Sequence, residues 1–138
     1  MLGIPHTVIH AAKCGPSMAD FKKKNIAFYR MFEENAEIHG VDMLTENSAE
    51  AWNPEYFLRT GKEMRAFVDE ADIPRLHINW DTGHANVQGC DQYTDILDIR
   101  CVNPSIKTIL QVDMSVFLFD QTDCRHEVTA AIRMTFYF

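Results

Sequence analysis

Residues 76–86 read LHINWDTGHAN, an apolar stretch that ends in an aspartate, a glycine and a histidine. Segment 76–82 is short, apolar and partly β-branched, which predicts a buried strand. Asp81 and His84 stand three residues apart at its end, and carboxylate and imidazole groups are both metal ligands. An ordinary Asx turn over 81–83, which would simply end the strand, is the alternative interpretation.

The same order of strand and helix occurs twice before this stretch. Ser17, with Asp20 three residues later, marks a helix start, and Gly40 lies where a glycine commonly follows a helix. Asn53-Pro54 is interpreted as the start of a second helix. The predicted strands are 4–12, 41–47 and 76–82, and the predicted helices are 17–40, 53–72 and 89–99. This alternation predicts an α/β fold with a parallel sheet.

The residues after 99 lack this alternation. Segments 105–120 and 127–138 are rich in β-forming residues, and we expect a hairpin or edge strands there. A chain of 138 residues has the length of one ordinary domain with a real core. We therefore expect one domain over 1–138, in which 4–99 forms strand–helix units and 100–138 is a divergent tail.

The composition excludes several functional classes. The net charge of −7 argues against a broad basic surface for nucleic acid, and the run Lys22-Lys23-Lys24 is interpreted as a solvated helix face. The four cysteines form neither a C-x-x-C pair nor a zinc-ribbon spacing. No segment approaches the roughly 18 apolar residues of a membrane span, and there is no apolar signal segment. We expect a reduced, cytoplasmic setting.

Polar residues follow each of the three predicted strands. His10 ends the first strand, Glu46 the second and Asp81 the third, with His84 one turn later. Because the carboxyl ends of parallel strands share one face, we expect these four side chains on one rim. Carboxylates with imidazoles suit Mg²⁺, Mn²⁺, Co²⁺ or Zn²⁺. The alternatives are a core histidine at position 10 and ordinary loop chemistry after Glu46.

The remaining histidines lie away from this rim in the predicted fold. His39 is interpreted as a cation near a helix C-terminus. His77 is expected at the start of a strand, and His6 at the opposite end of the first strand. The ligand-capable cluster DCRHE at 123–127 has no clear strand-end context, so we assign it no role in the site.

The series VIHA, LTEN and NWDTGHAN resembles the xylose isomerase-like TIM barrels. That superfamily contains sugar-phosphate isomerases and epimerases and the endonuclease IV class of DNA-repair enzymes. The passage FVDEADIPRLHINWDTGHAN is similar to the family's approach to a D-x-G-H motif, and the resemblance covers about residues 4–99. A complete eight-stranded (β/α) barrel takes about 250 residues. The resemblance therefore implies an α/β, partial TIM barrel of about three βα units with a β-prone C-terminal tail.

The resemblance also implies roles for individual residues. Glu46 and Asp81 match metal ligands. His84 matches a residue that contacts substrate oxygens in the epimerase branch, or a metal in the endonuclease branch. His10 matches a strand-end histidine that binds zinc in the endonucleases and is often retained in the sugar enzymes. We expect Glu46 and Asp81 to hold a divalent metal, Glu46 to act as the catalytic proton carrier, and His84 and His10 to contact substrate.

The sequence departs from the family pattern at several positions. His10 continues as His-Ala-Ala where His-Pro-Gly is more usual, and Leu110 stands where the next strand would carry a histidine. Trp52 stands six residues beyond Glu46, where some ketose epimerases keep a second acid/base glutamate, and Glu50 is a poor substitute. The closing glutamate strand has no counterpart. These departures favour a barrel fragment that lacks half of its metal ligands.

Three functional hypotheses follow. The leading one is a sugar or sugar-phosphate isomerase or epimerase that acts through an enediolate stabilised by a divalent metal, with Trp52 and Trp80 as candidate apolar walls for the sugar. The second is a zinc phosphodiesterase of the endonuclease IV kind, which the negative charge disfavours. The third is a non-catalytic sugar-binding or interaction module. The expected partner is a small sugar, without nucleic acid or membrane, and homo-oligomerisation stays open.

Overall fold

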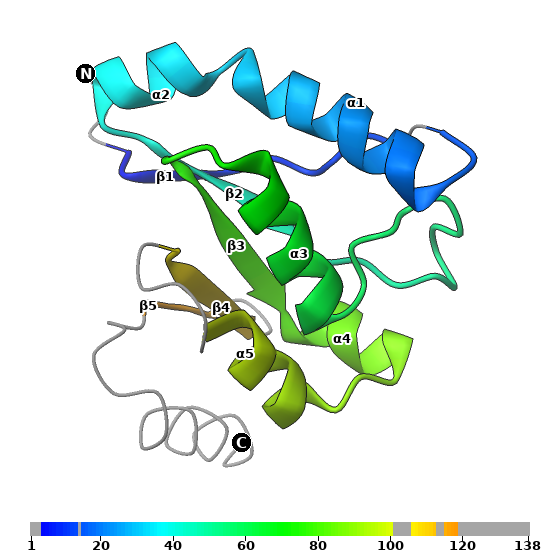
Figure 1. Cartoon of the computed structure of the whole chain (residues 1–138). Helices are drawn as coiled ribbons and strands as arrows, with labels where there is room; N and C mark the ends of the chain where they lie inside the picture. The colour runs from blue at the N-terminus through cyan, green and yellow to red at the C-terminus, as the bar shows by residue number, and fades with distance from the viewer. Residues whose placement is uncertain (1–3, 14, 101–105, 113–114, 119–138) are drawn as a thin grey trace.

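The computed structural model describes residues 4–13, 15–100, 106–112 and 115–118. Figure 1 shows the elements in their order along the chain. They are β1 (His6–Val8), α1 (Met18–Arg30), α2 (Glu33–His39), β2 (Asp42–Glu46), α3 (Gly61–Ala71), β3 (Leu76–Asp81), α4 (Thr82–Gln88), α5 (Gln92–Arg100), β4 (Thr108–Val112) and β5 (Ser115–Leu118).

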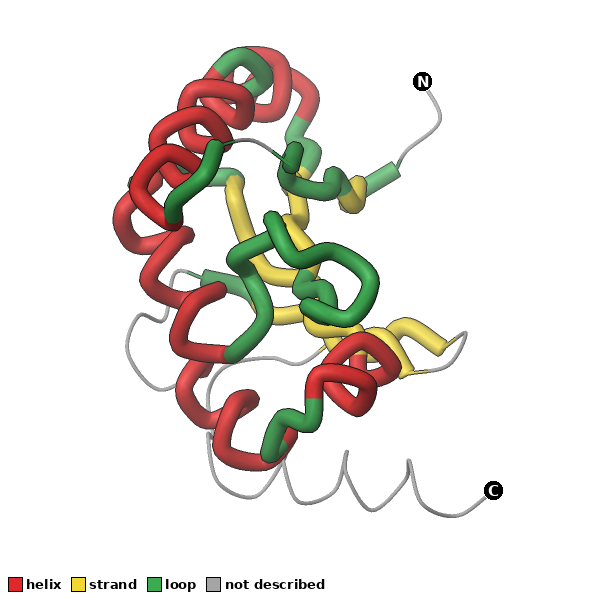
Figure 2. Tube along the Cα trace, turned by 90° about the vertical axis from the view of Figure 1, so that its right-hand side faces the viewer, coloured by secondary structure: helices red, strands yellow, loops and turns green. Residues whose placement is uncertain are grey.

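The described strands form one five-stranded sheet in the order β1-β2-β3-β4-β5. The pairs β1–β2, β2–β3 and β3–β4 are parallel, and β5 is antiparallel to β4. Figure 2 shows most of the helices in an arc along one side of the strands, as in the wall of a barrel. The prediction of an α/β fold with consecutive βα units is confirmed. Strands β4 and β5, which lie in the β-prone segment 105–120, form an antiparallel pair at the edge of the sheet. The segment 127–138 lies outside the described residues.

The two faces of the sheet differ in chemistry because side chains alternate along a strand. Leu76, Ile78 and Trp80 of β3 belong to the apolar core that also contains helix residues such as Phe67. The alternate β3 residues therefore face the concave side. Asn79 pairs in register with Glu46 of β2 and donates a hydrogen bond to its carboxylate. The outer face thus builds the core, and the concave face carries the polar side chains.

The helix predicted at 17–40 is two helices, which corrects that prediction. Ser17 caps α1 and Gly40 adopts the left-handed conformation after α2, as expected. Between them, Met31 and Phe32 donate i→i−3 hydrogen bonds that tighten the chain and end α1. Apolar side chains at and after this interruption point outward: Met31 is 74% exposed and Ile38 67% exposed. Apolar periodicity across 17–40 overestimated the buried face.

The helix predicted to begin at Asn53-Pro54 begins at Gly61 instead, with Thr60 as its cap in a capping box with Glu63. The preceding residues are held out of a helix by tertiary contacts. Arg59 donates hydrogen bonds to the carbonyls of Pro54 and Tyr56. The predicted end is correct within a residue, since α3 ends at Ala71.

Two further boundaries differ from the predictions. The strand predicted at 4–12 is the shorter β1, although the Ile9 amide still bonds to Leu44. The helix predicted at 89–99 is α5, and the sequence analysis missed α4 before it. α4 has only seven residues and starts directly after Asp81, the last residue of β3. Short helices of this kind lack enough periodicity to be distinguished from a turn.

The amino ends of the strands are joined by a buried carboxylate, that of Asp42. It pairs with Lys107 Nζ at 2.6 Å and Arg75 Nη1 at 2.9 Å, and with the rings of His6 and His77 at 3.5 and 3.6 Å. Burial opposes ionisation, but the Lys107 and Arg75 hydrogen bonds outweigh it and keep the pKa of Asp42 below its ordinary value. This cluster connects β1, β2, β3 and the residue before β4.

We expect Gly61→Ala to destabilise the protein although alanine is the better helix former. A Cβ at this position would lie 2.2 Å from the carbonyl oxygen of Asp95 in α5. Because backbone atoms cannot move aside as a side chain can, overpacking of about 1–3 kcal/mol exceeds the roughly 1 kcal/mol gain in helix propensity. Chemical denaturation measures the difference.

Lys62→Ala is the matched control, because Lys62 is the next residue of α3 and is exposed. It should change the free energy of unfolding by less than about 0.5 kcal/mol. Equal stability of Gly61→Ala and the parent would contradict the close contact between α3 and α5.

We expect Asp42→Asn to lower the free energy of unfolding by about 1–2 kcal/mol at pH 7, since it removes charge-assisted hydrogen bonds to partly exposed partners. A lowered pKa means that the carboxylate stabilises the fold above its unfolded value of 3.8, and that this contribution is lost as the pH falls through the folded pKa. The stability difference between the two proteins should therefore shrink as the pH falls from 3.8 through the folded pKa of Asp42. Denaturation at a series of pH values tests this.

Glu37→Gln is the control for Asp42→Asn. Glu37 also binds Arg75, at 3.0 Å, but its side chain is 67% exposed. Solvent screens such a pair, so the change should stay below about 0.5 kcal/mol at any of these pH values. A similar loss in both variants would assign the effect to Arg75 rather than to Asp42.

Candidate functional site

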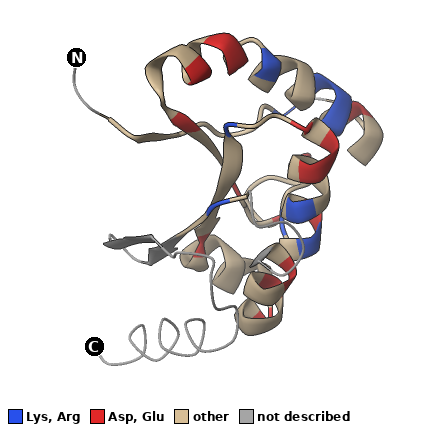
Figure 3. Ribbon diagram, turned by 60° about the vertical axis from the view of Figure 1, so that its left-hand side comes forward, with Lys and Arg blue, Asp and Glu red and all other residues tan. Residues whose placement is uncertain are grey.

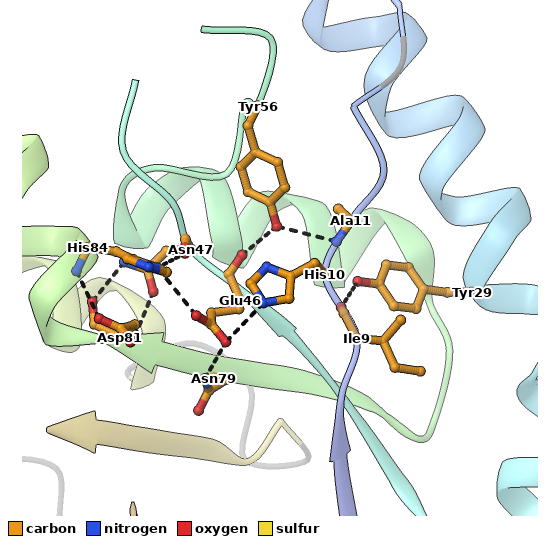
Figure 4. Close-up of polar contacts among 10 residues, drawn as sticks. All are labelled: Ile9, His10, Ala11, Tyr29, Glu46, Asn47, Tyr56, Asn79, Asp81 and His84. Carbon is orange, nitrogen blue, oxygen red and sulfur yellow. Dashed lines mark hydrogen bonds and ion pairs between the residues drawn. The ribbon is translucent and has the colours of Figure 1, made fainter. Parts of the chain in front are cut away.

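Glu46, the last residue of β2, lies at the centre of the polar group on the concave face (Figure 4). Its side chain is only 7% exposed. Asn79 Nδ2 donates to Oε2 at 2.9 Å, the His84 Nδ1 atom lies 3.3 Å from Oε1, and the His10 Nε2 atom lies 3.7 Å from Oε2. A buried carboxylate needs such partners, because burial without them is costly.

Asp81 serves at once as the end of β3 and as the N-cap of α4. Its Oδ1 atom accepts the His84 backbone amide at 2.8 Å. Its Oδ2 atom has no hydrogen-bond partner within the described residues. The Asx-type turn and the metal-ligand interpretation of WDTGH are therefore compatible, since the turn uses one carboxylate oxygen and leaves the other.

Asn47 holds the ends of β2 and β3 together. Its Oδ1 atom accepts the Asp81 amide at 2.6 Å, and its Nδ2 atom donates to the Asp81 carbonyl at 3.0 Å. The side chain thereby replaces one step of the backbone ladder beyond the last paired residues of the two strands. As a result Glu46, which precedes Asn47, is held beside Asp81.

The ring of His84 is oriented by the same residue. Its Nδ1 atom lies 2.7 Å from the Asn47 carbonyl oxygen and 3.3 Å from Glu46 Oε1. Both neighbours are acceptors, so we assign the proton to Nδ1. The Nε2 atom is then the free acceptor, and the side chain is 24% exposed. This tautomer leaves Nε2 for a ligand outside the protein.

His10 lies beyond the end of β1, on the other side of Glu46 from His84 (Figure 4). Its position depends on two tyrosines. Tyr29 donates to the Ile9 carbonyl at 2.5 Å, and Tyr56 accepts the Ala11 amide while donating to the Glu46 carbonyl at 2.6 Å. Burial raises the pKa of both tyrosines, so that the hydroxyls stay protonated and keep donating. The His10 side chain itself is 60% exposed.

The predictions for the other histidines agree with the structure where it describes them. His39 is the last residue of α2. His6 and His77 contact Asp42 at the amino end of the sheet, away from Glu46. Burial lowers the pKa of His77 and favours its neutral form. The cluster at 123–127 lies outside the described residues.

The two tryptophans occupy different environments. Trp80 is fully buried in the core, so it cannot serve as the wall of a sugar site. Trp52 is 56% exposed, and its ring centroid lies 5.3 Å from that of His84. Glu50 is turned to Arg59, with 2.8 Å between its Oε2 atom and Arg59 Nη1. The Glu50 carboxylate is therefore engaged by Arg59 rather than by the residues around Glu46.

Four residues that the sequence analysis did not assign organise the site. They are Tyr29, Asn47, Tyr56 and Asn79. Asn47 directly follows Glu46, and Asn79 lies two residues before Asp81 on the same face of a strand. Their positions next to predicted site residues could have indicated a role in the site. Tyr29 reaches the site from α1, 17 residues before Glu46, and Tyr56 reaches it from the loop before α3, 10 residues after Glu46. No local sequence pattern indicates these contacts.

The arrangement fits a small divalent cation. One ligand atom each from Glu46, Asp81 and His84 lies within 4.8 Å of the other two. Two ligand atoms on one cation stand at most about 4.4 Å apart, twice a bond of about 2.2 Å, so small side-chain rotations suffice. The donor set of two carboxylates and an imidazole suits Mn²⁺, Mg²⁺, Co²⁺ or Zn²⁺.

Two other properties bear on function. Burial raises the pKa of the Cys90 thiol to about 12, so this cysteine stays protonated and is no nucleophile. Among the described helices, none has the length and apolar character that crossing a membrane requires.

Comparisons with known proteins identify the fold. No protein-family model and no curated protein matches the sequence. Solved structures do match, among them a D-tagatose 3-epimerase-like protein, with a TM-score of 0.61, 18% identity and 76% of this chain covered. An AP endonuclease of family 2 from Brucella melitensis matches with a TM-score of 0.58, 20% identity and 70% coverage. The IOLI protein with a bound zinc atom matches with a TM-score of 0.61, 14% identity and 99% coverage.

This chain spans 39% of the epimerase-like protein, 39% of the endonuclease and 52% of the IOLI protein. Identities of this size establish the fold and leave the activity open. The parallel βα units, with their polar residues at the carboxyl ends of the strands, agree with that fold. The chain therefore has the fold of part of a (β/α) barrel and shares it with these proteins.

Proposed function

We propose that this chain carries the divalent-metal site of a sugar or sugar-phosphate isomerase or epimerase. The observation that carries the proposal is the approach of Glu46, Asp81 and His84 to within 4.8 Å at the carboxyl ends of two adjacent parallel strands. In a barrel of this kind the substrate site lies on that rim. The similarity to a D-tagatose 3-epimerase-like protein supports a sugar as the substrate.

Electrostatics at the two ends of the sheet support a cation at the rim. The Asp42 carboxylate at the amino end is neutralised by Arg75 and Lys107. The partners of Glu46 at the carboxyl end are an amide and two imidazoles, which carry no fixed positive charge. Since Asp81 adds a second carboxylate, the rim has a local excess of negative charge that a divalent cation would neutralise.

Each residue then has a role. Glu46 and Asp81 hold the cation, which when bound supplies the positive charge that an enediolate requires beside its oxygens. Glu46 Oε2, on the side of the exposed His10, takes the proton from the substrate carbon and returns it. His84 binds a substrate hydroxyl through Nε2, and His10 binds a second one from the opposite side of Glu46.

A zinc phosphodiesterase is the second candidate, because His84 belongs to the ligand group and an AP endonuclease shares the fold. One observation favours the sugar enzyme instead. Acidic and basic residues are interspersed along the described helices (Figure 3), whereas a protein that binds a polyanion commonly has clustered basic residues.

We expect Mn²⁺ to raise the melting temperature of the parent protein, and Glu46→Gln and Asp81→Asn to abolish this shift. A ligand at 100 times its Kd stabilises the folded state by about 2.7 kcal/mol. Asn is as good an N-cap as Asp, and Gln keeps an oxygen for Asn79, so both variants should stay folded. Thermal unfolding with Mn²⁺, Co²⁺, Zn²⁺ and Mg²⁺ provides the measurement.

Glu50→Gln is the control variant, since it removes an exposed carboxylate of the adjacent loop and should leave the Mn²⁺ shift intact. A parent protein without any metal-dependent shift would overturn the proposed site. Activity is then tested with ketoses and ketose phosphates in D₂O, where proton transfer at carbon introduces deuterium. Nicking of DNA with abasic sites, without deuterium uptake by sugars, would instead support the phosphodiesterase.

A further inference from the structure

The loop between β2 and α3 (47–60) places an exposed tryptophan beside the candidate site. The sequence contains two tryptophans, and the other one, Trp80, is fully buried. Trp52 is 56% exposed, although the indole is the largest apolar side chain. Large exposed aromatic groups commonly mark a binding surface, because they bury much area when a ligand covers them.

Contacts on both sides hold this loop in place. Glu50 donates its backbone amide to Gln88 Oε1 of α4 at 2.7 Å, and its side chain pairs with Arg59. Arg59 also donates to the carbonyl of Pro54 at 2.8 Å. The amide of Trp52 donates to the Ala49 carbonyl at 3.2 Å. The position of the indole is therefore set by the fold, and a ligand would meet a surface that is already formed.

The indole is in direct contact with a residue of the site. The rings of Trp52 and His84 meet edge to face, with centroids 5.3 Å apart and planes at 75°. His84 in turn lies 3.3 Å from Glu46. An apolar face and a set of polar groups thus border the same space on the rim. Ligand sites commonly combine aromatic side chains with a few polar groups in this way.

The charges of the loop restrict the ligand. Arg59 is the only lysine or arginine in 47–60, and it is already bound by Glu50 and the Pro54 carbonyl. The loop therefore offers an apolar face without a free cation, next to two carboxylates. A neutral polyhydroxylated ring, with hydroxyl edges and a C–H face, complements these features. A phosphate placed against the loop would face like charge.

We propose that Trp52 is a specificity-determining residue whose indole packs against the C–H face of an unphosphorylated sugar, while the sugar hydroxyls reach Glu46, Asp81 and His84. The inference rests on the proposed function for the location of the site. It adds to that function the class of substrate, a neutral ketose rather than its phosphate ester, and the residue that selects it.

Binding of D-fructose, D-tagatose and D-fructose 6-phosphate is measured by saturation-transfer NMR, with and without Mn²⁺. We expect Trp52→Ala to weaken binding of the neutral ketoses about tenfold, and Trp52→Phe, which keeps an aromatic face, to stay within about threefold of the parent. Bound ketose should also reduce acrylamide quenching of the parent's exposed tryptophan. Phe32→Ala, an exposed aromatic between α1 and α2, should bind as the parent does.

The Mn²⁺ shift of the preceding experiment should be the same in Trp52→Ala and the parent, because the indole is no metal ligand. Loss of that shift in the parent refutes the metal site, whereas the metal-free sugar titrations still test Trp52. Three results would overturn the inference. They are equal ketose binding by Trp52→Ala and the parent, no ketose binding by the parent, and preference of the parent for the phosphate ester.

Discussion

The side chain of Asn47 is the contact on which the polar rim depends. By pairing with both the amide and the carbonyl of Asp81, it continues the β2–β3 ladder past the point where the backbone pairs end. Its own carbonyl oxygen accepts a hydrogen bond from the Nδ1 atom of His84. One residue thereby sets the separation of Glu46 from Asp81 and the tautomer of the histidine between them. These backbone and ring contacts hold the two carboxylates close together although like charges repel.

The same strands bear a carboxylate at each end, and the surroundings give the two groups different properties. Asp42 is enclosed by a lysine, an arginine and two histidines, and it joins four consecutive parts of the sheet. Its charge is satisfied within the chain. Glu46 is equally buried, but its partners are the amide of Asn79 and the imidazoles of His10 and His84. The amino end of β2 therefore carries stabilising ion pairs, and its carboxyl end carries the candidate site. TIM barrels in general divide the two ends of their strands in this way.

The elements predicted from the sequence are correct where the local signals are strong. Ser17 and Gly40 bound the helical region as predicted, and the strands at 42–46 and 76–81 are found within a residue of their predicted ends. The errors arise where distant contacts override local preference. Asn53-Pro54 is a good helix start by composition, but the contacts of Arg59 and of the buried Tyr56 hydroxyl keep that segment out of a helix until Thr60. Local signals carry no information about such contacts.

The sequence by itself determined the alternation of strands and helices and the presence of His10, Glu46, Asp81 and His84 near strand ends. It did so because strand and helix periodicities are local, and because parallel strands end on a common face. Only the tertiary structure decided which atoms meet. The register of β2 against β3 sets Asn79 beside Glu46, and Asn47 turns His84. The loop 47–60 brings Trp52 to that histidine while Trp80 enters the core. These outcomes depend on packing between segments far apart in the chain, which no local pattern encodes.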